Sequence, residues 1–101
     1  MSVQEFFASL ENRVDPSRTA GMNNTYVFDI DGAGKWTVAV DDGRVNVSDG
    51  ASADADCTIT SSAESFERIV AGELNPTSAY MTGKLKVKGD MGAALKLQKL
   101  F

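Results

Sequence analysis

The stretch NPTSAYMTGKLKVKGDMGAALKLQKLF, residues 75–101, decides the fold, because it predicts a helix, a strand and a second helix with a capping or breaking residue at each junction. Asn75 has the side chain of an N-cap, and Pro76 suits the first helical position. Gly83 is a typical residue just beyond the end of a helix. The first helix of this stretch is therefore expected to run from Pro76 to about residue 82.

Charged and apolar residues alternate directly after that helix, in the run KLKVK of residues 84–88. Side chains of a strand point alternately to its two faces, so this run predicts a strand with Leu85 and Val87 on the core face. The opposite face then carries three ammonium groups, those of Lys84, Lys86 and Lys88.

The last segment is predicted to be a helix that is capped by Asp90 after a break at Gly89. Its apolar residues cover a wide arc and are Met91, Ala94, Leu95, Leu97, Leu100 and Phe101. An apolar segment of this kind is expected to pack back onto the fold or to contact another apolar surface.

The first residues predict a helix from Val3 to Arg13. Ser2 and Glu5 have the spacing of a capping box, and apolar residues follow at helical intervals. The connection over residues 15–23 contains a proline and a glycine and is expected to be a loop.

Three strands are predicted next, around residues 26–30, 36–40 and 45–47, where apolar and polar residues alternate. Asp42 and Gly43 are a strong signal for a two-residue turn between the second and the third strand. Consecutive strands joined by short turns form an antiparallel meander.

A fourth strand is predicted after a loop of small and acidic residues, with Cys57 and Ile59 pointing inward. Ser61 and Glu64 have the spacing of a second capping box. They predict a helix that ends near Gly72.

These elements predict one α+β domain over residues 1–101, with a five-stranded, mainly antiparallel sheet and helices packed on one face. Strands and helices do not alternate regularly, and no internal repeat is present, so the sequence does not favour a doubly wound parallel sheet.

Residues 75–97, NPTSAYMTGKLKVKGDMGAALKL, resemble the C-terminal signature of the sterol carrier protein 2 domain. Residues 55–76, ADCTITSSAESFERIVAGELNP, resemble the segment that precedes this signature in the same family. The first half of the chain matches the family in layout only. The resemblance implies a sheet and helices that enclose an apolar tunnel for fatty acids, acyl-CoA or sterols, without catalytic residues.

The resemblance makes a non-catalytic lipid-binding or lipid-transfer domain the first hypothesis. The residues expected to contact the lipid are the inward and C-terminal apolar ones, Phe6, Leu10, Phe28, Trp36, Val38, Phe66, Ile69, Met81, Leu85, Met91, Leu95, Leu97, Leu100 and Phe101. Periodicity alone predicts only an ordinary core for most of them. An empty pocket of about 300 Å³ costs about 7 kcal/mol, so the pocket is expected to be collapsed, filled, hydrated or plugged by the last helix.

An accessory protein-interaction module of a lipid or quinone pathway is the alternative, and an enzyme comes third. The chain has no histidine, which excludes catalytic triads that use histidine and metal sites whose ligands are histidines. No window of acidic residues fits a calcium loop, so no metal or cofactor is expected. Cys57 has no cationic neighbour in the sequence and is interpreted as a buried apolar residue.

Charge is distributed unevenly along the chain. Residues 1–83 contain 5 basic and 13 acidic residues and carry −8, whereas residues 84–101 contain 5 lysines and one aspartate and carry +4. The net charge of −4 does not favour nucleic-acid binding. No segment approaches the length of a membrane span, and the N-terminus lacks the features of a signal peptide, so a cytoplasmic location is expected.

Two interpretations remain open for Lys84, Lys86 and Lys88. Lysines on a strand prevent association between sheet edges, which needs no further function. Alternatively, together with Lys96 and Lys99 they make weak contact with an anionic membrane or with an anionic group of the ligand. A homodimer is also left open.

Overall fold

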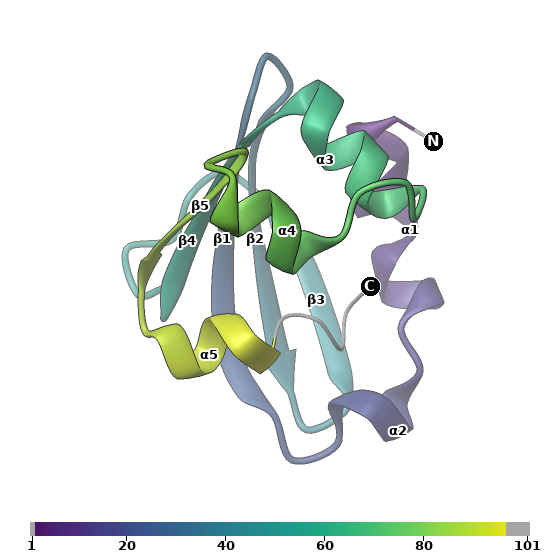
Figure 1. The fold of residues 1–101 in the computed structure, drawn as a ribbon. Coiled ribbons are helices and arrows are strands. Elements are labelled where there is room, and N and C mark those ends of the chain that lie inside the picture. The colour runs from purple at the N-terminus through teal and green to yellow at the C-terminus, as the bar shows by residue number, and fades with distance from the viewer. Residues whose placement is uncertain (1, 97–101) are drawn as a thin grey trace.

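The structure is a computed structural model that describes residues 2–96 (Figure 1). In this range the elements follow the order α1 (Val3–Arg13), α2 (Pro16–Thr19), β1 (Asn23–Asp31), β2 (Gly34–Asp41), β3 (Arg44–Asp49), β4 (Cys57–Ser62), α3 (Ala63–Val70), α4 (Pro76–Met81), β5 (Leu85–Gly89) and α5 (Met91–Lys96). The predicted helices and strands are present, and the short helix α2 is added to them.

The five strands form one mixed sheet in the order β3-β2-β1-β4-β5. The pairs β1–β2, β2–β3 and β4–β5 are antiparallel, which confirms the mainly antiparallel sheet and the meander. β4 returns beside β1 and runs parallel to it, with Tyr26 opposite Cys57 and Phe28 opposite Ile59. The sequence analysis did not predict this parallel pair.

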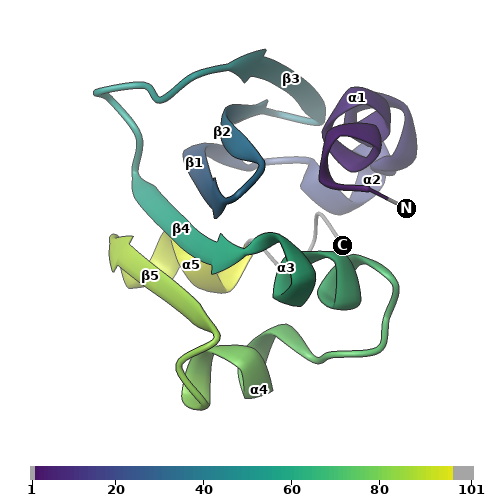
Figure 2. The ribbon, with the colours of Figure 1, turned by 90° about the horizontal axis from the view of Figure 1, so that it is seen from above.

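The helices lie on one face of the curved sheet, as predicted (Figure 2). The segment of residues 50–56, which joins β3 to β4, crosses the other face. There the Thr37 hydroxyl donates a hydrogen bond to the carbonyl oxygen of Gly50 (2.7 Å) and accepts one from the amide of Ser52 (3.1 Å). Val27 lies opposite Thr37 and is buried although it does not belong to the main core cluster.

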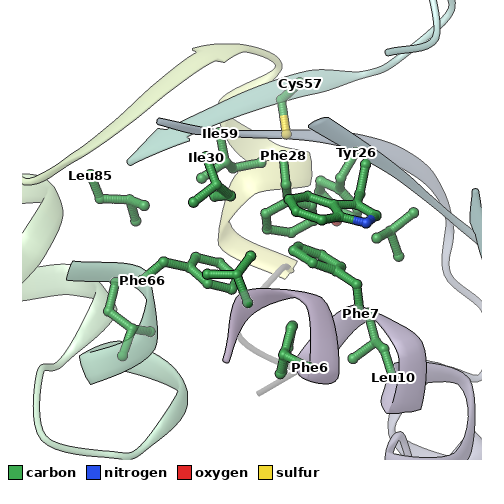
Figure 3. Packing of buried hydrophobic residues seen from close by; sticks show 14 of the residues in the cluster. Phe6, Phe7, Leu10, Tyr26, Phe28, Ile30, Cys57, Ile59, Phe66 and Leu85 are labelled. Atoms are coloured by element: carbon green, nitrogen blue, oxygen red, sulfur yellow. The ribbon is translucent and has the colours of Figure 1, made fainter. Parts of the chain in front are cut away.

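Aromatic side chains from α1, β1, β2 and α3 form the centre of the core (Figure 3). The ring of Phe7 stacks on Trp36, with centroids 4.5 Å apart, and on Phe66 at 5.5 Å. Phe28 meets Phe7 at 5.2 Å and Phe66 at 5.9 Å. Phe28 and Phe66 therefore form the boundary between this aromatic core and the part of the fold around β5.

Several local predictions are confirmed. Ser2 and Glu5 form the capping box of α1. Asp42 and Gly43 both have positive φ angles, 43° and 90°, as a tight turn between β2 and β3 requires. The Asp90 carboxylate accepts hydrogen bonds from the amides at the start of α5, those of Gly92 (2.8 Å) and Ala93 (3.3 Å).

Two local predictions are wrong. The expected loop at residues 15–23 contains α2, whose N-cap Asp15 accepts a hydrogen bond from the amide of Ser17 at 2.9 Å. The N-cap of α3 is Ser62 rather than Ser61. Ser61 continues the inward alternation of β4 and is buried, and its hydroxyl donates a hydrogen bond to the carbonyl oxygen of Ser62 (3.1 Å), whereas the Ser62 hydroxyl accepts the hydrogen bond from the amide of Ser65.

Candidate functional site

An apolar cavity of about 130 Å³ lies between the sheet and the helices near β5. Its described lining residues come from strands β1, β4 and β5 and from helices α3, α4 and α5. They are Phe28, Ile59, Phe66, Ile69, Pro76, Thr77, Tyr80, Leu85, Val87, Met91, Ala94 and Leu95.

The floor of the cavity follows the register of the sheet. Phe28 of β1 lies opposite Ile59 of β4, and Ile59 lies opposite Val87 of β5. Neighbouring residues on one face of a sheet form a continuous row, so these three side chains make one apolar strip across three strands. Leu85 extends the strip two residues along β5.

The walls follow the spacing of helical faces. Thr77 and Tyr80 are three residues apart on α4, and Met91, Ala94 and Leu95 have the spacing i, i+3 and i+4 on α5. The neighbouring residues Ala79 and Ala93 are buried. Small side chains at these two positions let both helices approach the sheet on either side of the cavity.

The cavity is open to solvent between α4 and α5. Tyr80 is 45% exposed, Met91 is 46% exposed and Leu95 is 71% exposed, although all three line the cavity. Residues that contact both a cavity and solvent form its rim. Apolar side chains that remain this exposed beside an apolar cavity are typical of a binding site.

The chemistry of the described lining is apolar. Thr77 and Tyr80 contribute its hydroxyl groups, and no described lining residue is charged. The Cys57 thiol is buried in the core, and burial, followed by the charges of Asp56 and Asp90, raises its pKa to about 11. A thiol with this pKa is protonated at neutral pH and is a poor nucleophile.

The described residues contain no cluster of three or more histidine, cysteine, aspartate or glutamate side chains that could hold a metal ion. In the same range, no helix is long and apolar enough to cross a membrane.

The structure brings together six of the residues that the sequence analysis expected to contact a lipid, namely Phe28, Phe66, Ile69, Leu85, Met91 and Leu95. Four others lie in the core away from the described lining: Phe6, Leu10, Trp36 and Val38. Met81 does not line the cavity and is 79% exposed on α4. Leu97, Leu100 and Phe101 lie outside the described residues.

The sequence analysis omitted six lining residues, which are Ile59, Pro76, Thr77, Tyr80, Val87 and Ala94. Alternation had already assigned Ile59 and Val87 to the core face, so their proximity to the cavity follows from the order of the strands. Ala94 and Tyr80 lie at helical spacing from Met91 and Thr77. That helical spacing was the sequence signal that could have identified Tyr80 and Ala94 as residues of the cavity walls.

A second hollow, more polar than the cavity, lies at the ends of α1, α2 and α3. Arg13 and Arg18 line it, and so does Asp15. Ile69 and Pro76 line both the hollow and the cavity, so the two spaces are adjacent.

Comparison with known proteins gives consistent results. A family model described as the SCP-2 sterol transfer family matches residues 3–101. Hydroxysteroid dehydrogenase-like protein 2 of Xenopus tropicalis is 36% identical over 101 residues, which are 97% of this chain and 24% of that protein. Sterol carrier protein 2 of Homo sapiens is 45% identical over 65 residues, which are 64% of this chain and 12% of that protein.

The chain thus spans about a quarter or less of the length of these relatives. Among solved structures, the solution structure of palmitated SCP2L2 from Aedes aegypti superimposes with a TM-score of 0.79 at 28% identity. That match covers 99% of this chain and 94% of the other.

Proposed function

The chain belongs to the SCP-2 sterol transfer family, whose domains generally bind or transfer lipids, and we propose that it binds a single-chain lipid in the cavity beside β5 without catalysing a reaction. The observation that carries this proposal is the apolar lining of the cavity together with its exposed apolar rim. A hydrocarbon chain gains about 0.8 kcal/mol for each methylene group removed from water, which is the main driving force expected here.

The size of the cavity predicts how the lipid enters. At about 130 Å³ the cavity is smaller than the roughly 300 Å³ at the lower end of ordinary ligand pockets. An empty cavity of this volume lowers the free energy of unfolding by about 3 kcal/mol, which is less than the stability of a typical domain. We expect the space to widen when a lipid binds, by movement of α4 and α5, since these two short helices form the rim.

The second hollow favours a lipid with an anionic head group, such as a fatty acid or its acyl-CoA ester. Arg13 and Arg18 line this hollow, and Ile69 and Pro76 line both the hollow and the cavity. Arginine recognises carboxylates and phosphates through paired hydrogen bonds. An acyl chain in the cavity and a carboxylate in the hollow would use both spaces. Palmitate is a suitable first ligand, because a related protein has been solved in a palmitated form.

The direct test combines native mass spectrometry of the purified chain with thermal unfolding in the presence of palmitate. A ligand at a hundred times its Kd adds about 2.7 kcal/mol to the stability of the folded state. For a domain of about 100 residues this corresponds to a rise in Tm of about 10 °C or more. No shift with fatty acids, acyl-CoA, sterols or quinones would contradict lipid binding.

The head-group assignment has a separate test. Changing Arg13 and Arg18 together to Gln should weaken the binding of palmitate and leave the binding of hexadecanol unchanged, because the alcohol has the same chain and no charge. Equal losses for both ligands would contradict the assignment and leave the apolar site intact.

The alternative function is an accessory module that binds another protein. It is supported by the relatives in which the matched region is 24% or 12% of a longer protein. This function predicts a stable complex with a partner and no effect of lipids on unfolding. A cytoplasmic location and a homodimer remain predictions of the sequence.

A further inference from the structure

The two edges of the sheet differ in how far they are covered. At the β3 edge, helix α1 lies beside the strand, and a carboxylate oxygen of Glu11 accepts a hydrogen bond from the backbone amide of Val47 at 2.8 Å (Figure 2). At the β5 edge, no described element other than β4 hydrogen-bonds to the backbone of residues 85–89. An uncovered edge carries backbone amide and carbonyl groups that can pair with a further strand.

Hydrogen bonds fix both ends of β5. At its start the amide of Lys84 donates to the carbonyl oxygen of Ala79 (2.8 Å), and beyond its end the amide of Asp90 donates to the carbonyl oxygen of Asp56 (2.9 Å). The strand between these two bonds is five residues long and pairs with β4 along its length. The β5 edge is therefore already extended and held in place, so a strand that pairs with it does not first have to order it.

Two lysines of β5 point away from the helices. Lys86 and Lys88 alternate with the residues of β5 that line the cavity, so they lie on the opposite face of the sheet. Both side chains are exposed, and the residues opposite them on β4 are Thr60 and Thr58. Within residues 2–96 neither ammonium group has a carboxylate as an ion-pair partner. The open edge thus carries two positive charges that its neighbours in the sheet do not neutralise.

We propose that the β5 edge binds an extended peptide segment of a partner protein in which acidic and apolar residues alternate, and that this segment adds a sixth strand to the sheet. Residues directly opposite each other on neighbouring strands have Cβ atoms about 5 Å apart, so the acidic side chains pair with Lys86 and Lys88. The apolar side chains lie on the other face, opposite Leu85 and Val87. There they continue the apolar strip that crosses the sheet from Phe28 to Val87.

A second copy of the chain is a poorer partner for this edge. Antiparallel pairing of β5 with another β5 places lysines opposite lysines, and like charges directly opposite each other are destabilising. The lysines therefore have two effects: they discourage pairing with a basic or neutral strand and favour pairing with an acidic one. This partner does not occupy the cavity, so the proposal is separate from the binding of a lipid.

NMR titration at neutral pH with a short synthetic peptide in which glutamate and valine alternate is the first test. The amide signals of β5 should shift, and those of β3 should not. A peptide with glutamine in place of glutamate should bind about fivefold more weakly, which corresponds to about 0.5 kcal/mol for each of two cross-strand charge pairs. No binding of the glutamate–valine peptide, or shifts confined to β3, would overturn the proposal.

Two double variants of the protein separate the edge from the net charge. Lys86→Gln and Lys88→Gln together should weaken binding of the glutamate–valine peptide about fivefold. The matched control is Lys35→Gln with Arg44→Gln, at exposed positions of β2 and of β3, the other edge strand. It changes the net charge by the same amount and should leave the affinity nearly unchanged. Equal losses for the two double variants would show that net charge governs binding, and would overturn the proposal.

A charge exchange tests the pairing directly. Lys86→Glu and Lys88→Glu together should abolish binding of the glutamate–valine peptide and should allow binding of a peptide in which lysine replaces glutamate. Both positions are exposed, so the exchange should leave the fold intact, which the NMR spectrum of the variant reports. A folded variant that still prefers the glutamate–valine peptide would contradict contact between the acidic side chains and these two positions.

Methylation of the peptide's backbone nitrogen atoms tests main-chain pairing. In an extended peptide the amides of the glutamates and those of the valines point to opposite edges, so methylation of one set blocks one edge only. One of the two methylated peptides should lose binding, and the other should keep it. Equal affinities of the two would show that the peptide is not held as a strand, and would overturn the proposal. These measurements need no added lipid, so their outcome is independent of whether the cavity binds palmitate.

Discussion

The Tyr26 hydroxyl donates a hydrogen bond to the carbonyl oxygen of Ala93 at 2.6 Å and so ties β1 to α5. Tyr26 is completely buried, and burial is the main cause that raises its pKa, followed by the charges of Cys57, Asp56 and Asp90. Ala93 precedes Ala94, which lines the cavity. The bond therefore fixes one wall of the proposed lipid site to the centre of the sheet.

Tyr26→Phe should loosen this wall. The variant keeps the ring but leaves the carbonyl oxygen of Ala93 without its donor, which costs about 1–3 kcal/mol. Urea unfolding should report that loss of stability. The substitution should also accelerate hydrogen exchange more at the amides of α5 than at those of β1. Tyr80→Phe is the control, because Tyr80 is exposed at the rim. Equal stability of Tyr26→Phe and the parent would contradict a tether at this position.

Gly89→Ala should destabilise the end of β5. Gly89 has a φ angle of 114°, and a Cβ atom there would lie 2.5 Å from the carbonyl oxygen of Asp56 and 2.9 Å from the Cα atom of Cys57. The same oxygen accepts a hydrogen bond from the amide of Asp90 at 2.9 Å, so it cannot move without disturbing the bond that joins the residue before β4 to the junction of β5 and α5. We expect a loss of several kcal/mol, or a failure to fold, from the combination of strain and overpacking.

Gly50→Ala separates the two causes. Gly50 also has a positive φ angle, 90°, but nothing lies within 4 Å of a Cβ atom there. This variant should lose about 1–2 kcal/mol from backbone strain alone. If Gly89→Ala is no less stable than Gly50→Ala in urea unfolding, the close contact of the added Cβ atom with Asp56 does not contribute to the loss of stability.

The strands and the longer helices could be predicted because their signals are local. Alternation assigned Leu85 and Val87 to the core face, and the spacing of Ser2 and Glu5 located the start of α1. The parallel pair of β1 and β4 could not be predicted in this way, since pairing depends on where the segment of residues 50–56 crosses the sheet. Burial of Val27 on the face without helices depends on the same crossing.

The candidate site was only half predictable for a related reason. Periodicity identifies inward residues, but it does not separate those that fill the core from those that border a cavity. Phe6 and Phe66 lie together in the aromatic cluster, with ring centroids 5.4 Å apart, yet Phe66 borders the cavity and Phe6 does not. Phe66 borders the cavity because of where α4 and α5 lie relative to β5. The hydrophobic pattern of these two helices does not predict that placement.

Ala94→Phe should fill the cavity. Ala94 is half-buried in the wall formed by α5, and an aromatic ring at this position occupies the space proposed for the acyl chain. We expect the loss of palmitate binding, at least tenfold in Kd by calorimetry, with stability unchanged or increased because the cavity is filled. Ala8→Phe, at an exposed position of α1, is the matched control and should bind palmitate normally. Full affinity of Ala94→Phe would move the lipid site away from this cavity.

The stability of the fold should fall at alkaline pH because of Cys57. Its pKa is raised from 9.0 to about 11 in the folded state, chiefly by burial. Between these two values the unfolded chain releases the thiol proton and the folded chain retains it, so rising pH favours unfolding. The contribution of Cys57 is complete below pH 9 and is lost as the pH approaches 11. From pH 8 to pH 10 the free energy of unfolding should fall by about 1 kcal/mol through this group.

Cys57→Ala isolates this contribution in urea unfolding at a series of pH values. The variant should be less stable than the parent at pH 8, because it removes the buried sulfur atom, but the difference should shrink toward pH 10 as the parent loses the thiol's contribution. Tyr26 also has a raised pKa, above an ordinary value of 10.0, so it begins to lower the stability near pH 10, but it does so in parent and variant alike and cancels in their difference. A constant difference between parent and variant from pH 8 to pH 10 would mean that the thiol does not titrate differently in the folded and unfolded states.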